Sequence, residues 1–161
     1  MALKAAQTAP DFQLTATDAK PLSLSEALAA GPVLLAFFKV TCPTCQYTFP
    51  FLERLQQQLP GARIWGIVQD SAQDGARFAA NFRVTFPILV DERNYPVSRA
   101  YDPEHVPTLF LVKSDGCIEI TSEGFVKADL AAMQKSLAAS LSVAPPALFL
   151  PTERIPEYKP G

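Results

Sequence analysis

The sequence predicts an α/β protein in which helices flank one mixed β-sheet. Short apolar runs that suit buried strands recur along the chain, and amphipathic stretches that suit helices separate them. The pattern closes with a hairpin and a final helix, which adds antiparallel strands to the sheet. A length of 161 residues with 48% hydrophobic side chains is enough for one packed domain.

The first predicted elements are short. Asp11–Leu14 is expected to form an edge strand. Ser23 is a candidate N-cap for a helical turn, with Glu26 three residues later, and Gly31-Pro32 ends that turn. The next run, Val33–Phe38, is apolar and partly aromatic, which predicts a buried central strand.

A long amphipathic helix is predicted after this central strand. Its apolar stripe recurs at intervals of three and four, at Phe49, Leu52, Leu55 and Leu59. Polar side chains fall between these positions and form the solvated face. Cys42 is therefore expected at or near the N-cap, and Pro43 at the first helical position, where a missing N–H costs nothing.

The second half of the chain continues the alternation of strands and helices. We expect strands at 62–68, 86–91, 108–112 and 117–120, a helix at 74–82, a helical turn at 97–101, a hairpin turn at 114–116 and a helix at about 127–141. The buried stripe of the last helix is expected at Leu130, Met133, Leu137 and Leu141.

The sequence divides into a domain at 1–142 and a proline-rich C-terminal tail at 143–161. Five of the 15 prolines lie in this tail, at Pro145, Pro146, Pro151, Pro156 and Pro160. Apolar side chains such as Leu148, Phe149 and Ile155 make the tail too hydrophobic for a free linker. We therefore expect it to lie extended across its own domain or across a twin subunit.

Composition excludes several function classes. The formal net charge of −2 and the lack of a Lys/Arg cluster argue against nucleic-acid binding. No apolar stretch approaches the roughly 20 residues that a membrane-spanning helix needs. The first residues contain no hydrophobic signal-peptide core, which predicts a cytoplasmic protein, or a periplasmic one only if a leader has been removed. A reducing compartment would keep its cysteines as thiols at rest.

The motif Cys42-Pro43-Thr44-Cys45 is the main candidate for chemistry. Unpaired amides and the positive end of the helix dipole favour a thiolate at Cys42, while Cys45 lies one turn inward, within disulfide reach but more buried. This arrangement predicts a redox-active Cys42–Cys45 disulfide that needs no prosthetic group. Thr41, Pro43 and Thr44 surround the reactive sulfur and are candidate substrate-binding residues.

Two other interpretations of the cysteines stay open. A structural disulfide across so short a loop would remove little entropy from the unfolded chain. A metal site could use Cys42, Cys45, His105 and Cys117, although the chain has no second CxxC and no HxxxH. Cys117 follows a predicted hairpin turn, where a strand residue packed as a small hydrophobe is favoured over a resolving thiol.

Several motifs occur together in an order that resembles a known family. The CxxC follows a strand, Pro50 lies five positions past Cys45, and Val106-Pro107-Thr108 comes later in the chain. Two further stretches, at 9–14 and 86–91, precede Tyr101. Over about residues 8–142 this set resembles the thioredoxin fold, and within it the redoxin branch of AhpC/TSA and TlpA-like proteins.

The resemblance implies a thioredoxin-like sandwich with an extra strand and helix before the proline loop. It also implies a cis peptide bond between Val106 and Pro107 beside the dithiol. A cis X-Pro bond costs only about 0.5–1 kcal/mol, and it would leave an open backbone edge at Val106 with which a substrate chain could pair. Val106 and Pro107 are therefore candidate substrate-binding residues.

This chain departs from the family at positions that matter for proton transfer. Ala36 replaces the buried Asp of thioredoxins, Thr48 replaces the Glu of many TlpA-like reductases, and Thr41 replaces the common Trp before the motif. The nearest candidates for proton handling by sequence are Lys39, Glu104 and His105.

We therefore expect thiol–disulfide exchange, in which Cys42 attacks and Cys45 resolves. The expected partner is a disulfide-containing protein or a small thiol, with electrons from a thioredoxin-reductase-type system or another dithiol donor. A homodimer is consistent with the apolar tail. Such a protein would contribute to cell redox homeostasis.

A peroxiredoxin-like thiol peroxidase, with an antioxidant role, is the main alternative. The motif P-x-x-x-T-x-x-C of that group places its reactive cysteine at Cys45, its Thr at Cys42 and its Pro at Phe38, so two of three positions differ. The Arg that assists peroxide cleavage would fall near Pro107 and is absent there. A non-catalytic interaction module, suggested by the proline-rich tail, is a third interpretation.

Overall fold

The computed structural model describes residues 1–161. Its strands are β1 (Gln13–Ala16), β2 (Pro21–Ser23), β3 (Val33–Phe38), β4 (Arg63–Val68), β5 (Ile88–Val90), β6 (Thr108–Val112), β7 (Ile118–Glu123), β8 (Phe125–Val126) and β9 (Tyr158–Lys159). Its helices are α1 (Leu24–Ala30), α2 (Pro43–Gln58), α3 (Ala72–Asn81), α4 (Pro96–Tyr101) and α5 (Lys127–Ser140).

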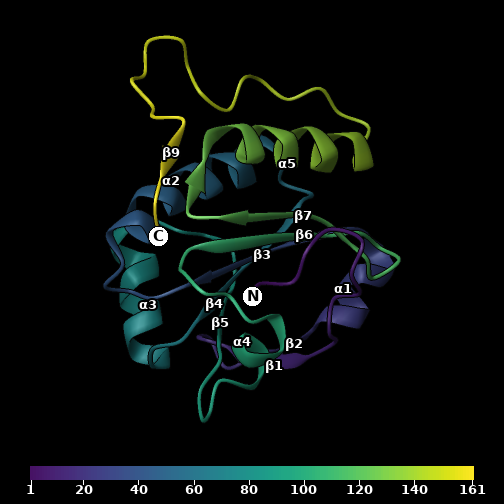
Figure 1. Cartoon of the computed structure of the whole chain (residues 1–161), viewed down its shortest axis with the longest axis vertical. Helices are drawn as coiled ribbons and strands as arrows, with labels where there is room; N and C mark the ends of the chain where they lie inside the picture. Colours follow the sequence, from purple (N-terminus) through teal and green to yellow (C-terminus); the bar gives the residue numbers. More distant parts are fainter.

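Seven strands form one mixed sheet in the order β2-β1-β5-β4-β3-β6-β7. The three strands β3, β4 and β5 run parallel to one another, whereas β6, β7, β1 and β2 are antiparallel to their neighbours. Helices flank the sheet (Figure 1). The predicted fold class, a helix-flanked mixed sheet, is therefore confirmed.

The extra strand and helix implied by the redoxin resemblance are present. β5 and the short helix α4 lie between α3 and the loop that contains Pro107. In the sheet, β5 is inserted between β4 and β1, with Ile67 opposite Leu89 on one side and Ala16 opposite Leu89 on the other. These two elements account for the long interval between Cys45 and Pro107.

The two faces of the sheet have separate hydrophobic cores because successive side chains of a strand point to opposite faces. On β3, one set of alternating residues packs with α2, α3 and α5, and comprises Leu34, Ala36 and Phe38. The other set packs with α1 and α4, and comprises Val33, Leu35 and Phe37. Trp65 of β4, which is 5% exposed, belongs to this second core and packs edge-on against Phe12.

Local sequence signals located most helix ends correctly. Ser23 caps α1 by accepting a hydrogen bond from the amide of Glu26 at 3.4 Å, as its spacing predicted. Ser71 caps α3 in the same way, so this helix begins two residues earlier than expected. The β6–β7 hairpin is present, and Gly116 supplies the positive φ of 88° that its turn requires.

The strand predicted at Asp11–Leu14 exists, but its predicted bounds and its predicted place at the sheet edge were wrong. The strand begins at Gln13 and lies inside the sheet, where it pairs with β2 on one side and β5 on the other. β2 is the edge strand instead, and it opens with Pro21, a residue that an edge tolerates because one side of the strand needs no N–H donor.

The tail at 143–161 folds back over α2 and α5 of its own chain (yellow in Figure 1). Leu148 is 3% exposed, and the ring of Phe149 packs against Phe51 and Phe125 at centroid distances of 5.2 and 6.2 Å. The tail then returns as β9, which pairs antiparallel with β8. The sequence predicted the docked tail in outline but not these two short strands.

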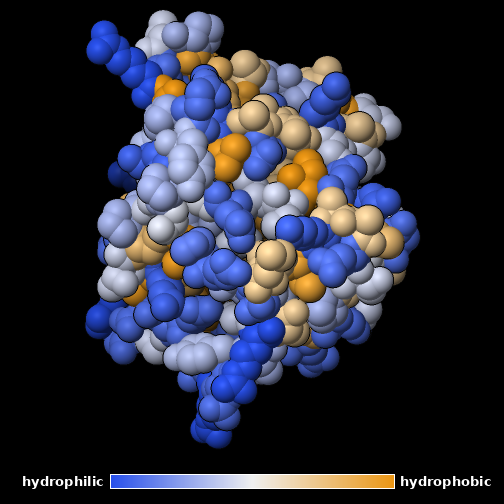
Figure 2. Space-filling view, in the orientation of Figure 1, coloured by the Kyte–Doolittle hydropathy of each residue, from blue (hydrophilic) through white to orange (hydrophobic).

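The molecular surface mixes hydrophilic and hydrophobic residues. On the face shown in Figure 2, apolar residues form small patches separated by hydrophilic side chains. None of the five helices is both long enough and apolar enough to cross a lipid bilayer.

Candidate active site

The junction between β3 and α2 positions the two cysteines of the motif. Cys42 is the N-cap of α2, and its Sγ accepts a hydrogen bond from the amide of Cys45 at 3.0 Å. Pro43 follows at the start of the helix, as predicted. Amides at a helix N-terminus stabilise negative charge, so this position suits a sulfur that attacks as a thiolate.

The two sulfurs differ in access to solvent. Both cysteines are free thiols, but Cys42 is partly exposed whereas Cys45 is fully buried. Burial raises the pKa of the Cys45 thiol, and the hydrogen bond with Cys42 raises it further, against a smaller opposing effect of a backbone hydrogen bond from Lys39. At neutral pH Cys45 therefore stays protonated.

The cis peptide segment Val106-Pro107 lies against the sulfur of Cys42. The bond between Val106 and Pro107 is cis, which confirms the geometry implied by the resemblance. The Sγ of Cys42 donates a hydrogen bond to the carbonyl oxygen of Val106 at 3.3 Å. The loop is held by Thr108, whose hydroxyl donates to the carbonyl of His105 at 2.6 Å. The structure thus brings Cys42, Val106 and Pro107 together.

Two polar residues that the sequence did not single out hold the loop before the motif. Asp70 accepts a hydrogen bond from the amide of Val40 at 2.8 Å, and the side-chain amide of Gln46 donates to the carbonyl of Val40 at 2.9 Å. Val40 lies between β3 and Cys42, so these bonds hold the loop that leads into α2. No local motif indicates them, because Asp70 is thirty residues away from Val40.

The three candidate binding residues next to Cys42 in sequence have different environments. Thr41 and Pro43 are exposed and are accessible to a partner. Thr44 is 8% exposed, and its hydroxyl donates a hydrogen bond to the carbonyl of Pro160 at 2.6 Å. Thr44 therefore contacts the tail of its own chain, a contact that the sequence did not predict.

The side chains proposed for proton handling lie at the surface. Lys39 and His105 are exposed, and Glu104 forms an ion pair with the amino group of Met1 at 3.2 Å. None of the three side chains makes a hydrogen bond to a cysteine sulfur. The structure shows no hydrogen bond between these side chains and the dithiol, and their role stays a prediction.

The positions where related proteins carry a buried acid supply no base here. Ala36 is fully buried in β3. Thr48 is also buried, and its hydroxyl donates to the carbonyl of Thr44 at 2.7 Å, one turn back along α2. Both positions are therefore occupied by side chains that take no proton from Cys45.

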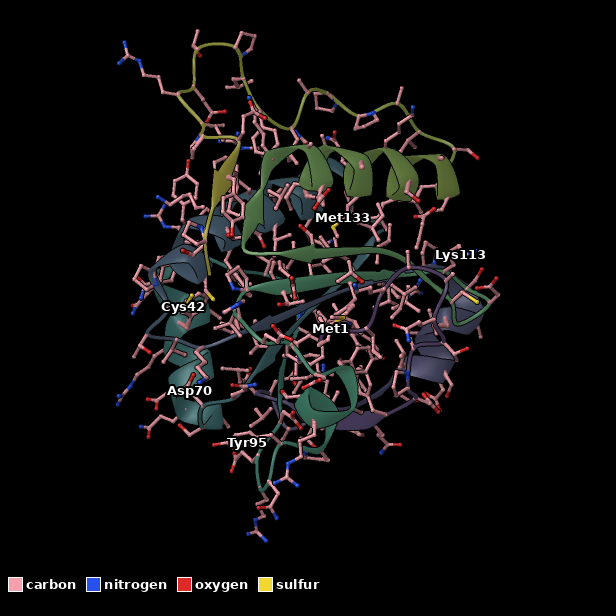
Figure 3. All side chains as sticks on the ribbon, in the orientation of Figure 1. Met1, Cys42, Asp70, Tyr95, Lys113 and Met133 are labelled. Atoms are coloured by element: carbon pink, nitrogen blue, oxygen red, sulfur yellow. The ribbon has the colours of Figure 1, made fainter.

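Cys117 is remote from the other two cysteines. Its backbone carbonyl accepts a hydrogen bond from Lys113, and Figure 3 shows Lys113 and Cys42 at opposite sides of the molecule. No group of three or more His, Cys, Asp or Glu side chains is positioned to hold a metal ion. The four-residue metal site weighed from the sequence, which needed Cys117 beside Cys42, is therefore wrong.

The fold and the site define a thioredoxin-fold redoxin, in which a dithiol opens a helix and faces a cis proline. Residues 5–121 match the AhpC/TSA family, and the chain belongs to that family. The thiol-disulfide oxidoreductase ResA of Geobacillus thermodenitrificans is 30% identical over 121 residues, which are 73% of this chain and 68% of that protein.

Solved structures share the same architecture. The crystal structure of a putative thiol:disulfide interchange protein DsbE from Chlorobium tepidum superposes with a TM-score of 0.75 and 26% identity, covering 88% of this chain and 99% of that one. The peroxidoxin BcpB from Mycobacterium tuberculosis superposes with a TM-score of 0.71 and 24% identity, covering 87% and 97%. Since one fold supports both names, the reaction must be argued from the site.

Proposed function

We propose that this protein is a thiol–disulfide oxidoreductase in which Cys42 attacks a partner disulfide and Cys45 resolves the mixed disulfide. The contrast between the two sulfurs carries the proposal. Cys42 is partly exposed at a helix N-terminus, whereas Cys45 is buried one turn further along the helix. The amide of Cys45 donates a hydrogen bond to the Sγ of Cys42. The name of the ResA relative supports the same reaction type.

The proposed exchange has two displacement steps. The Cys42 thiolate attacks one partner sulfur, the partner S–S bond breaks, and the released sulfur takes up a proton. Cys45 then loses its proton and attacks Cys42, which forms the Cys42–Cys45 disulfide and releases the second partner sulfur. Two electrons and two protons pass from the protein dithiol to the partner disulfide, and the reverse sequence would oxidise a partner dithiol.

The raised pKa of Cys45 fits the resolving role. A protonated thiol does not compete with Cys42 for the partner, and its deprotonation is needed only after the mixed disulfide has formed. Lys39, Glu104 and His105 remain the proposed proton-handling groups. Since none of their side chains makes a hydrogen bond to a sulfur, they would act through solvent.

The proposed partner is a disulfide-containing protein or a small thiol, and the proposed electron source is a thioredoxin-reductase-type system or another dithiol donor. The candidate binding surface comprises Thr41, Pro43, Thr44, Val106 and Pro107. Val106 supports this assignment because its amide makes no hydrogen bond within the chain, which leaves a donor with which a partner backbone can pair.

A trapping experiment tests the assignment of the two thiols. In the Cys45→Ser variant, oxidised glutathione should leave a stable glutathione adduct on Cys42, which intact-mass spectrometry and peptide mapping would detect. The wild-type protein should release the adduct and form its own disulfide. Cys117→Ser is the matched control and should behave as wild type.

Absence of an adduct on Cys45→Ser, with the folded state verified by circular dichroism, would contradict the assigned roles. An adduct that maps to Cys117 rather than to Cys42 would show that the attack had been assigned to the wrong thiol. The direction of the reaction needs a further measurement, the reduction potential of the pair. A value near or below about −250 mV indicates a reductase, and one near about −120 to −180 mV indicates an oxidant or isomerase.

The structure supports thiol exchange better than a dedicated peroxidase. Cys45, which aligns with the reactive cysteine of peroxiredoxin-like motifs, is fully buried, so a peroxide would not reach it without a change in α2. Reduction of hydrogen peroxide by the wild-type protein at a rate well above that of free cysteine would favour the alternative.

The cellular location and oligomeric state also remain proposals. The proposed location is cytoplasmic, or periplasmic if a leader has been removed, and fractionation of the source cells would test it. A homodimer would appear in sedimentation velocity as a species of twice the mass of the 17.5 kDa chain.

A further inference from the structure

The segment at 157–161 lies over the proposed active site. Its strand β9 pairs with β8, placing Lys159 opposite Phe125 and Tyr158 opposite Val126. The next residue, Pro160, accepts the hydrogen bond from the hydroxyl of Thr44 at 2.6 Å. In Figure 1 the yellow strand descends to the start of α2, and Figure 3 labels Cys42 in the same region.

The end of this segment also reaches the cis-proline loop. A Cβ atom added to Gly161 would lie 2.5 Å from the carbonyl oxygen of Val106 and 3.2 Å from the Cβ of His105. The same carbonyl oxygen accepts the hydrogen bond from Cys42. Gly161 therefore packs its backbone directly on the residue whose open edge is the proposed docking place for a partner chain.

Gly124, which belongs to the domain rather than to the tail, permits the close approach of the tail backbone. Gly124 has a φ of +76°, and a Cβ atom there would lie 2.5 Å from the carbonyl oxygen of Lys159 and 3.3 Å from the amide nitrogen of Gly161. The tail and the strip from Gly124 to Val126 thus meet backbone to backbone, as an extended partner chain would meet them.

Contacts upstream hold the tail independently of its last five residues. Glu153 forms two hydrogen bonds with the guanidinium of Arg54, at 2.7 and 2.9 Å, and Leu148 is buried against the domain. A Lys127–Glu157 ion pair at 3.6 Å and Lys159 over the Tyr47 ring at 5.1 Å add weaker contacts near the site.

We propose that residues 157–161 occupy the surface on which the backbone of a protein substrate must lie, so that the resting protein exchanges readily with small disulfides and poorly with protein disulfides. This inference rests on the proposed function. A tethered segment competes at an effective concentration in the millimolar range, which a weakly binding protein partner does not match. Small disulfides reach the partly exposed Cys42 without needing the backbone surface.

Deletion of residues 157–161 tests the proposal, because the variant keeps Leu148, Phe149 and the Arg54–Glu153 pair. We would compare reduction of insulin, with dithiothreitol as electron source, against exchange with oxidised glutathione. The deletion should raise the insulin rate by about tenfold, as expected for removal of a competitor present at ten times its dissociation constant. Glutathione exchange should change by less than about twofold.

Two further measurements keep the test independent of folding defects. The synthetic peptide Glu157–Gly161, added to the deletion variant, should lower the insulin rate again, whereas a peptide of scrambled order should not. In the full-length chain, Glu153→Gln should loosen the tail without removing any residue and should raise the insulin rate by only about twofold, because solvent screens a partly exposed ion pair and its contribution is small.

The outcomes separate the two proposals. Unchanged insulin reduction in the deletion variant and in Glu153→Gln, with glutathione exchange intact, would overturn the tail inference and leave the oxidoreductase function standing. Equal gains for insulin and glutathione would also overturn it, since the tail would then shield Cys42 from all disulfides alike. If the unmodified full-length chain does not exchange with oxidised glutathione, both the proposed function and the tail inference are overturned.

Discussion

The two faces of the sheet are covered to different depths. On one face, α1, α4 and the N-terminal segment form a single layer over the strands. On the other face, α2, α3 and α5 pack on the strands, and the tail forms a further layer over α2 and α5 (Figure 1). Cys42 lies on the side that carries the extra layer. Helix α2 therefore packs against two partners, the core beneath it and the tail above it.

The largest expected effect is on the rate of disulfide exchange, and it should separate Cys42 on one side of the molecule from Cys117 on the other. Cys42→Ser should lower the rate of exchange with oxidised glutathione by about a thousandfold or more, because it removes the proposed attacking group. Cys117, whose neighbour Ile118 belongs to the core of the other face, should tolerate Cys117→Ser with unchanged exchange. The release of reduced glutathione measures both rates. Equal losses in the two variants would break the contrast between the two sides.

Two matched leucine substitutions test how much each layer contributes to stability, one in the single layer and one in the added layer. Leu28 of α1 and Leu148 of the tail are 8% and 3% exposed. Leu28→Ala should lower the free energy of unfolding in urea by about 2–5 kcal/mol. Leu148→Ala should lower it by less, because the loss cannot exceed the free energy that holds the tail in place.

Limited proteolysis completes this comparison. Leu148→Ala should become sensitive to cleavage within 143–161 while the domain stays resistant, whereas Leu28→Ala should lose resistance throughout. Losses of stability of the same size, with no selective cleavage of the tail, would mean that the tail is an integral part of the core.

Acid should weaken the Arg54–Glu153 contact that holds the added layer. The Arg54 guanidinium and the amide of Leu150 hold the pKa of Glu153 at about 2, well below its ordinary value of 4.5. A lowered carboxyl pKa stabilises the docked tail fully above about pH 4.5, and that contribution is lost as the pH falls toward 2. The NMR shift of the Leu150 amide, which donates to Glu153, should titrate with a midpoint near pH 2. A midpoint near 4.5 would show that the pair does not hold the tail in solution.

The smallest expected effect concerns Lys159, whose ammonium lies over the Tyr47 ring. Lys159→Met keeps the aliphatic stem and removes the charge, so the loss of docking free energy should be about 0.5–1 kcal/mol. Insulin reduction should rise by about twofold to fivefold, since 1.4 kcal/mol corresponds to a factor of ten. Lys135→Met, at an exposed position of α5, is the matched control and should leave the rate unchanged.

Local patterns predicted the elements whose causes are local. The apolar run at β3, the Ser23 cap and the position of Cys42 at the start of α2 each depend on a few neighbouring residues, and each was located correctly. The cis bond before Pro107 came from the family resemblance rather than from the residues themselves.

The remaining features depend on contacts between distant parts of the chain. β8 and β9 have two residues each, too few for a periodic signal, and they exist because Phe125 meets Lys159 across the intervening helix and tail. The bond from Asp70 to the Val40 amide and the bond from Thr44 to Pro160 likewise join segments that no local pattern connects. Lys39 and His105 are next to the site along the backbone, since the Lys39 carbonyl accepts from the Cys42 amide and His105 precedes Val106, but both side chains are exposed.

The position of Trp65 makes its fluorescence a probe of folding. It is the sole tryptophan of the chain, and it lies in the core of the face away from Cys42, beside Phe12. Its fluorescence should report exposure to water when the domain unfolds and stay constant when the dithiol is oxidised. Emission and thiol titration therefore give two independent signals in one sample, so a redox midpoint can be measured while the integrity of the fold is monitored.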